Sequence, residues 1–419
     1  MSTVKESAPA GVGPIPLRRN RDFMLLWTGA GFASLGSHLT MVLYPLLVVW
    51  QGGSPVAAGL VTSAAVLPHL VVQLPAGVLV DRFDRRRLMI TADVGCIVVS
   101  GSVLAAVALD TVQIGHLMVA AFLHSSFSIG YELAERTAAR HLVHDSQVPA
   151  ALGQNEARKR AVGMLGDPVG SLLFSLVRWT PFLMTVVAHV VSLVELLLIR
   201  KRFQAERTVG TARDVRTEIA EGIRWLWRQP FLRAAMLLIA GSNLIFAGII
   251  LTLIVIIHNS GTSPAAVGLI LAAGGLGGVV GALTASWWRR LVPIRAILPG
   301  GLFVWALAIA PLAVLEQPVS IGVLFACCGY IGGAINVIGY VYAVQVTPDE
   351  ILGRAMSVMM LLGSGANFLG ALAIGFALDA WRVDQTVVVM AAGMSLLALI
   401  GLVNPAVKGV REPSEAHSK

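Results

Sequence analysis

The chain has 419 residues, of which 56% are hydrophobic and 13% charged, and its mean hydropathy is +0.78. A soluble domain carries about 25% charged residues, so this composition excludes a single soluble globule and indicates a polytopic membrane protein. The formal net charge of +8 would also suit a nucleic-acid-binding protein, but the basic residues are concentrated between apolar segments, which excludes that partner.

Twelve apolar segments, most of them near the length of about 20 residues that crosses a bilayer, follow one another along the chain. They lie at 23–50, 56–80, 88–109, 112–133, 161–178, 181–199, 232–257, 264–287, 294–315, 318–342, 354–378 and 385–405. We therefore predict an all-α membrane protein with about 12 transmembrane helices. The expected parts are a tail at 1–20, a six-helix bundle at 21–200, a linker at 201–230, a second six-helix bundle at 231–405 and a tail at 406–419.

The basic residues predict the orientation of these helices. All but Arg178 and Arg382 of the 31 Lys and Arg residues fall on one side of the membrane, including Arg158, Lys159 and Arg160 in a predicted loop. Positive loops face the cytoplasm, so both termini are expected there, in a multi-pass protein of the plasma (bacterial inner) membrane. Residues 1–16 lack the apolar stretch and cleavage site typical of a signal peptide, so we expect them to form a cytoplasmic tail.

The two halves carry weak internal repeats. Ser54-Pro55 with Gly59-Leu60 reappears as Ser263-Pro264 with Gly268-Leu269, and Leu152-Gly153 with Gly170 reappears as Leu352-Gly353 with Gly370. We therefore expect pseudo-symmetric bundles. Between them, Val215, Ile219, Ile223 and Leu226 recur at helical spacing, which predicts an amphipathic helix on the membrane surface; a partner-binding helix is the alternative.

A charged loop joins the second and third segments. It reads Gly77-Val-Leu-Val-Asp81-Arg82-Phe-Asp84-Arg85-Arg86-Arg87, and the pattern G-x-x-x-D-R-x-x-R-R resembles the signature of the major facilitator superfamily. The resemblance implies two six-helix bundles that rock about a central cavity, and a latch in which Asp81 engages the N-terminus of the eleventh helix. Its members would be Gly77, Asp81, Arg82, Arg85, Arg86 and Arg354. A loop that only fixes orientation is the alternative.

Further motifs resemble a subgroup of that superfamily. Gly166-Asp-Pro168-Val-Gly170-Ser171 is similar to the glycine-proline signature of drug exporters, with the proline displaced and one glycine replaced by serine. The loop sequence at 81–87, Glu-Gly-Ile-Arg-Trp-Leu and Gly353-Arg354 resemble proton-driven macrolide and siderophore exporters. The mid-span arginine that many proton-coupled exporters carry in the fourth helix is missing.

Ionisable residues within apolar segments are costly and mark transport pathways. The candidates for proton coupling are Asp167, Glu132, Glu135, His124 and His38. Asp167 has no opposite charge within one helical turn, but an arginine from another helix is an alternative partner. Glu132 and Arg136 are i,i+4 neighbours that can neutralise each other, and each histidine can be a packing residue. His189 is less favoured, and Asp93 and Glu195 are expected to anchor helix ends near the cytoplasmic face.

The remaining cavity candidates are aromatic or neutral, which suits a bulky amphiphile. They are Tyr44, Gln73, Phe127, Tyr131, Asn243, Asn336, Tyr340 and Asn367; facing lipid or packing on neighbouring helices is the alternative for each. Cys96, Cys327 and Cys328 lack the sequence spacing of metal ligands, so we expect no metal site and no cofactor.

We therefore expect a monomeric secondary transporter that exports a small amphiphilic molecule against protons, with membrane lipids as its surroundings. Two alternatives keep the same fold, a proton-coupled importer and a lysophospholipid-type carrier. A non-transporting membrane sensor or a membrane enzyme is disfavoured, because none of the H-E-x-x-H, G-x-S-x-G or phosphate-loop motifs is present.

Overall fold

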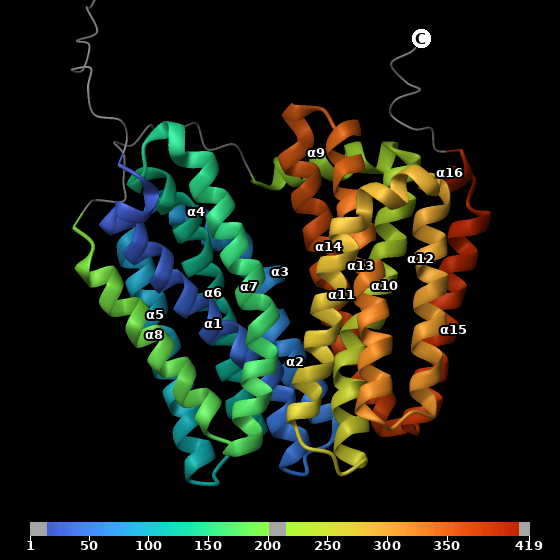
Figure 1. Ribbon diagram of the computed structural model, residues 1–419, viewed down its shortest axis with the longest axis horizontal. Coiled ribbons are helices and arrows are strands. Elements are labelled where there is room, and N and C mark those ends of the chain that lie inside the picture. Colours follow the sequence, from blue (N-terminus) through green and yellow to red (C-terminus); the bar gives the residue numbers. More distant parts are fainter. Residues whose placement is uncertain (1–14, 201–214, 410–419) are drawn as a thin grey trace, which may run out of the picture.

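The protein consists of two helical bundles that stand side by side (Figure 1). We describe a computed structural model over residues 15–200 and 215–409; the side chains of Asp81, of residues 215–219 and of Asp349 and Glu350 lie outside the description. The described residues form helices and turns and no strand. Both ends of the described chain lie at the same face, which we call the terminal face.

The first bundle holds the helices up to residue 198. They are α1 (Arg21–Trp50), α2 (Pro55–Val66), α3 (Pro68–Val71), α4 (Gln73–Arg82), α5 (Arg85–Ala108), α6 (Ile114–Leu142), α7 (Val148–Leu176) and α8 (Thr180–Leu198), with short 3-10 turns at Leu17–Arg19 and Asp145–Gln147. The segment predicted at 56–80 is one broken span, α2 to α4, that bends by 47°. Pro68 and Pro75 explain the break, because each removes a backbone donor from the helix.

The second bundle follows a surface helix, α9 (Val215–Arg228), as predicted. Leu226 of α9 is buried, whereas Ile223 and Trp227 are exposed. The bundle itself contains α10 (Pro230–Asn259), α11 (Ala265–Leu291), α12 (Ile294–Ile309), a 3-10 turn at Ala310–Ala313, α13 (Pro318–Val346), α14 (Asp349–Ala380), α15 (Val383–Val403) and α16 (Pro405–Lys408).

Ten described helices are long and apolar enough to cross a membrane, and the bent pair adds an eleventh. The twelfth is α7, which has 29 residues but carries Glu156, Arg158, Lys159 and Arg160 in its first half. These charges keep it below the apolarity of an ordinary span, although α7 runs the length of the first bundle (Figure 1). The predicted class, an all-α membrane protein with two pseudo-symmetric bundles, is confirmed.

The bundles touch at the end away from the terminal face, through equivalent glycines. A Cβ at Gly59 of α2 would lie 2.9 Å from the Ala371 carbonyl oxygen of α14, and a Cβ at Gly268 of α11 would lie 2.8 Å from the Pro168 Cα of α7. Gly59 and Gly268 are the repeated positions of the sequence. Near the terminal face, in contrast, no atom lies within 4 Å of a Cβ at Gly77, Gly153 or Gly353. The two bundles meet at the end away from the terminal face, and their ribbons diverge toward that face (Figure 1).

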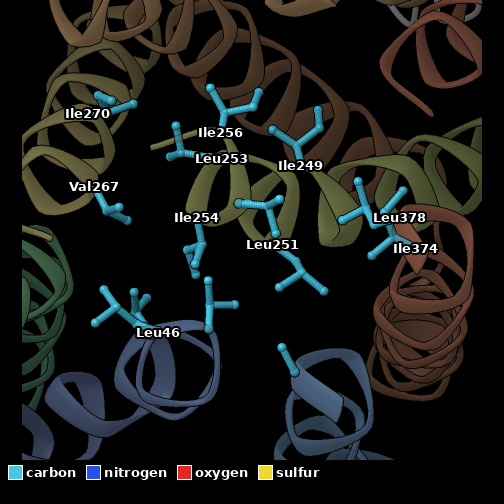
Figure 2. Packing of buried hydrophobic residues seen from close by; sticks show 14 of the residues in the cluster. Leu46, Ile249, Leu251, Leu253, Ile254, Ile256, Val267, Ile270, Ile374 and Leu378 are labelled. Carbon is cyan, nitrogen blue, oxygen red and sulfur yellow. The ribbon is translucent and has the colours of Figure 1, made fainter. Parts of the chain in front are cut away.

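An apolar cluster fills the end where the bundles meet (Figure 2). Ile254 and Leu251 of α10 are buried and lie between Leu46 of α1 and the α14 residues Ile374 and Leu378 in one continuous core. Contacts of this kind are non-directional, so they can be kept over a range of angles between the bundles. Hydrogen bonds also link the bundles, from Ser63 Oγ to the Phe368 carbonyl oxygen at 3.5 Å and from Gln73 Nε2 to Met360 Sδ at 3.1 Å.

Within the second bundle, α11 and α13 approach backbone to backbone. Cβ atoms at Gly281, Gly329 and Gly333 would overlap the carbonyl oxygens of Tyr330, Gly274 and Gly278, respectively. Glycine allows this close approach because it has no side chain to separate the helices.

We expect Gly333→Ala to destabilise the protein by about 1–3 kcal/mol, because the new methyl group overpacks the α11–α13 seam. The measurement is the apparent unfolding temperature of the detergent-solubilised protein. Gly339→Ala is the matched control, since Gly339 lies in the same helix with no neighbour within 4 Å of its Cβ position. Equal unfolding temperatures for the two variants would contradict the seam.

Candidate functional site

A cavity of about 140 Å³ lies inside the first bundle, between α1, α5, α6, α7 and α8. Its lining includes the polar and ionisable residues Ser37, His38, Cys96, Glu132, Glu135 and Lys159. Three of the predicted proton-coupling residues, His38, Glu132 and Glu135, therefore border one space.

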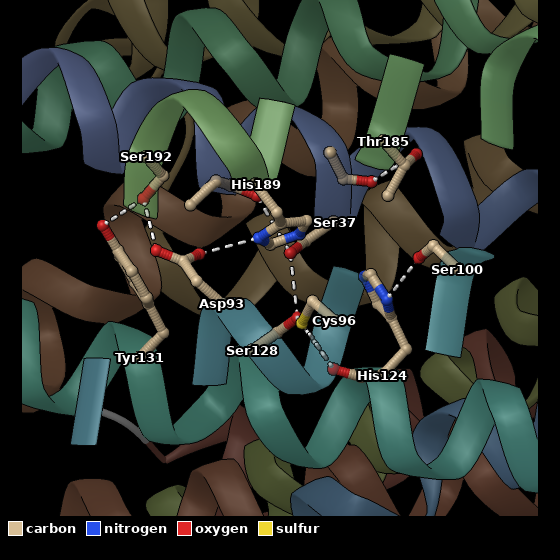
Figure 3. Close-up of polar contacts among 12 residues, drawn as sticks. Ser37, Asp93, Cys96, Ser100, His124, Ser128, Tyr131, Thr185, His189 and Ser192 are labelled. Carbon is tan, nitrogen blue, oxygen red and sulfur yellow. Dashed lines mark hydrogen bonds and ion pairs between the residues drawn. The ribbon is translucent and has the colours of Figure 1, made fainter. Parts of the chain in front are cut away.

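A chain of hydrogen bonds runs along one side of this cavity (Figure 3). The fully buried Asp93 of α5 accepts from His189 Nδ1 at 2.9 Å and from Ser192 Oγ at 2.7 Å, both on α8. The Ser192 hydroxyl group has one proton, which it donates to Asp93. The Tyr131 hydroxyl group therefore donates to Ser192 Oγ, at a distance of 2.9 Å. Asp93 is thus part of the bundle interior. The expectation that it anchors a helix end near the cytoplasmic face is wrong, because its partners lie on α8 and are buried.

His124 of α6 lies beside this chain. Its Nδ1 is 3.2 Å from Ser100 Oγ, and its ring meets the His189 ring edge to face with centroids 5.5 Å apart. Cys96 Sγ lies close to both rings, and one donor atom from each of Cys96, His124 and His189 falls within 4.8 Å of the others. The expectation of no metal site was based only on residues that are close together in the sequence. Such reasoning misses a set drawn from three helices, although Cys96 and Ser100, and likewise His189 and Ser192, share a helix face.

Glu132 lies at the wider side of the cavity with two cationic partners. It accepts from Arg136 Nη2 at 2.9 Å, as the i,i+4 alternative anticipated, and from Lys159 Nζ of α7 at 2.6 Å. Its side chain is 48% exposed, so solvent can reach this group.

Glu135 forms a buried ion pair with Arg158, at 3.0 Å between Oε1 and Nη2. The side chains are only 3% and 5% exposed, respectively. Arg158 Nη1 also donates to the Trp27 carbonyl oxygen at 2.7 Å, and its guanidinium lies 5.9 Å from the Trp27 ring centroid. The sequence placed Arg158 in a loop; the structure places it inside α7, where it joins α1, α6 and α7.

Asp167 lies further along α7, on the stretch that packs against both bundles. Its neighbour Gly166 faces His38 of α1, where a Cβ would lie 2.6 Å from the His38 Cβ, and Pro168 meets Gly268 of α11. Within the described residues Asp167 has no ion pair and no side-chain hydrogen bond. The alternative of an arginine partner from another helix is therefore not observed.

The repeat gives Asp167 and His38 neutral counterparts in the second bundle. The register that aligns Gly170 with Gly370 aligns Asp167 with Asn367 and Gly163 with Gly363. A Cβ at Gly163 would meet the His38 ring at 3.5 Å, and a Cβ at Gly363 would meet Asn243 Nδ2 at 3.3 Å. Two titratable side chains in the first bundle thus correspond to two amides in the second.

The structure places the predicted latch residues at the terminal face but does not test the latch. The Asp81 side chain lies outside the described part, and Gly77 lies in open space at this face, so close helix contact at this glycine is not observed.

The arginines of the predicted latch lie at the ends of helices. Arg86 caps the end of α8 through the carbonyl oxygens of Leu196 and Leu197, at 3.2 and 3.0 Å. Arg354 of α14 pairs with Glu221 of α9 at 2.5 Å. Arg82 ends α4, and Arg85 begins α5.

The predicted substrate-cavity residues are dispersed. Tyr44 is buried against Phe182, and Phe127 packs where a Cβ at Gly95 would lie. Gln73 of α4 reaches Met360 of α14 across the two bundles at 3.1 Å. Asn336 and Tyr340 share an exposed face of α13, whereas Tyr131, Asn243 and Asn367 are buried or partly buried.

Two helical bundles that meet at one end, with ionisable groups inside one of them, define a membrane transporter of the major facilitator type. The chain belongs to the transmembrane secretion effector family of that superfamily, whose model matches residues 13–417. It is thus an integral, multi-pass membrane protein.

Named relatives and solved structures agree with this class. The chain is 28% identical to the multidrug efflux pump Tap of Mycolicibacterium fortuitum, over 91% of this chain and 95% of the relative. It is 23% identical to macrolide efflux protein A of Streptococcus pyogenes, over 93% and 96%. A bacterial homologue of the human lysosomal transporter Spinster shares the fold, with a TM-score of 0.74, 12% identity and coverage of 93% and 98%. The nucleoside transporter NupG does so with a TM-score of 0.70, 14% identity and coverage of 94% and 100%.

The buried ion pair between Glu135 and Arg158 leads to a prediction about the stability of the protein. Glu135→Gln should destabilise the protein by about 3–5 kcal/mol, since it leaves the Arg158 charge buried without its partner. The double variant Glu135→Leu with Arg158→Met should recover most of that loss. Apparent unfolding temperatures of the single and double variants measure the coupling, with Asp384→Asn, which breaks an exposed pair with Arg382, as control. The coupling would be contradicted if the losses of stability in Glu135→Leu alone and Arg158→Met alone add up to the loss in the double variant.

Proposed function

We propose that this protein exports a small amphiphilic molecule, of the drug, macrolide or siderophore-like class, in exchange for protons. The family, and the efflux pumps and efflux proteins among its relatives, support the direction of transport and the substrate class. The single observation that carries the proton coupling is Asp167, a carboxyl group at the joint between the bundles that has no charge partner among the described residues.

The mechanism we propose is alternating access. The bundles meet at the end away from the termini and diverge toward the terminal face. If the basic loops face the cytoplasm, this is the state that receives substrate from inside. The apolar cluster around Ile254 then serves as the region about which the bundles rock.

Protonation of Asp167 would favour one of the two states. An unpaired carboxylate in an apolar setting is costly, and a proton removes that charge. Asp167 lies between the contacts to α1 and α11, so the angle between the bundles sets how much water reaches it. A proton shifts the equilibrium between the two arrangements of the bundles only if it binds Asp167 more tightly in one of them. A difference in the hydration of Asp167 between the two arrangements would supply this difference in affinity. One proton that moves inward across 100 mV contributes about 2.3 kcal/mol.

Asp167→Asn tests the coupling in inverted membrane vesicles whose lumen is acidified by respiration. A pH-sensitive dye reports the loss of the proton gradient when a macrolide, a cationic dye or a siderophore is added. Asp167→Asn should abolish this response, because the amide cannot exchange a proton. Glu156→Gln is the control in the same helix, since Glu156 is exposed and pairs only with Arg160. An unchanged response in Asp167→Asn would move the coupling to Glu132 or Glu135, whereas no response in any vesicle would favour an importer or a facilitator.

We propose in addition that Asp81 holds the terminal face shut in the other state, by approaching the N-terminus of α14, where the helix dipole favours an anion. Arg86 keeps this loop on α8, and the ion pair with Glu221 keeps Arg354 in place at the start of α14. Asp81→Asn should lower export several-fold at normal expression. Asp84→Asn is the matched control, because the amide oxygen still caps the Arg87 N–H of α5. Equal export by the two variants would rule the latch out.

A further inference from the structure

We propose that Cys96, His124 and His189 form a binding site for a zinc-class divalent cation inside the first bundle. The three residues come from α5, α6 and α8, and their donor atoms lie within 4.8 Å of one another. Ligand atoms around tetrahedral zinc, with bonds of about 2.0–2.3 Å, are about 3.4–3.7 Å apart. A small inward movement of side chains thus brings the three donors to bonding distance.

The two imidazoles present bare nitrogens to the thiol. His189 donates its Nδ1 proton to Asp93, which leaves Nε2 as the atom with a free lone pair. The Nδ1 of His124 lies 3.2 Å from Ser100 Oγ, and in the tautomer that donates this bond its Nε2 also has a free lone pair. The Nε2 atoms of both histidines are buried and have no hydrogen-bond partner among the described residues. A buried nitrogen without a partner costs free energy. The Cys96 thiol has one proton and can satisfy only one of the two nitrogens, whereas a bound cation would satisfy both.

The burial of the three side chains matches a built site. Cys96, His124 and His189 are 1%, 3% and 2% exposed. Asp93 orients His189 as carboxylates orient metal-binding histidines elsewhere, and Ser192 and Tyr131 in turn hold Asp93 (Figure 3). A surface cluster formed by chance would lack this second layer of contacts.

The donor set selects the kind of ion. One thiolate and two imidazoles suit zinc and related borderline metals, whereas magnesium and calcium require oxygen ligands. Cys96 and His189 also line the cavity, so an ion held there would have a route of entry and space for a fourth ligand. A bound ion would tie α5, α6 and α8 together, whatever the direction of transport.

Cobalt(II) is the spectroscopic probe for this site. The full-length protein, purified through a tag without histidine and held in detergent, is titrated with Co²⁺. We expect one equivalent to give a thiolate-to-cobalt charge-transfer band, and one equivalent of Zn²⁺ to bleach it. Cys96→Ser should abolish the band, and Asp93→Asn should weaken cobalt binding by about 10–100-fold.

Two controls isolate the site. A variant with Cys327→Ser and Cys328→Ser leaves Cys96 as the single thiol of the chain and should keep the band. His144→Ala should also keep it, because His144 bonds to Ser146 outside the bundle. Gel filtration checks that each variant is folded. A wild-type protein without the band, or a band that persists in folded Cys96→Ser, would overturn the proposal; since no transport is measured, that outcome leaves the proposed export untouched.

Discussion

Polar groups inside a membrane bundle have no water to satisfy them, and the first bundle depends on how its side chains satisfy one another. Asp93 joins α5 to α8, Ser192 extends that contact to Tyr131 of α6, and Arg158 joins α7 to α6 and α1. Helices of this bundle are thus held by directional bonds between ionised or strongly polar groups.

The second bundle is held by a different kind of contact. Its α11 and α13 meet through glycines with their backbones in contact, and their polar links are few, such as Trp288 Nε1 to Tyr330 Oη at 2.7 Å. Close packing of this kind resists deformation but carries no charge that could respond to a proton. The two halves therefore share a fold but differ in what holds their helices together, polar and charged groups in the first bundle and close glycine packing in the second.

The sequence was sufficient for the helices, their pairing into two halves and the surface helix, because apolar length and helical spacing are local properties. It was insufficient where distant helices meet. Arg158 was assigned to a loop because its neighbours Lys159 and Arg160 are charged, yet its buried partner Glu135 is on another helix. His189 was less favoured as a functional residue because it lies on the sixth predicted segment, although its Nδ1 binds Asp93 at 2.9 Å. The break at Pro68 was not expected either, since the surrounding residues are apolar throughout.

The repeat explains why one half would carry the coupling. Where the second bundle has Asn367 and Asn243, the first has Asp167 and His38, in the same register and against equivalent glycines. Carboxamides and these titratable groups fill similar space and form similar hydrogen bonds, so packing alone does not require the difference. What differs is the ability to gain or lose a charge. A titratable group is costly within a membrane, and no residue in the described part of the chain neutralises Asp167 or gains stability from its charge. A cost without a packing benefit, at the joint where the two bundles meet, is the pattern expected of a functional group.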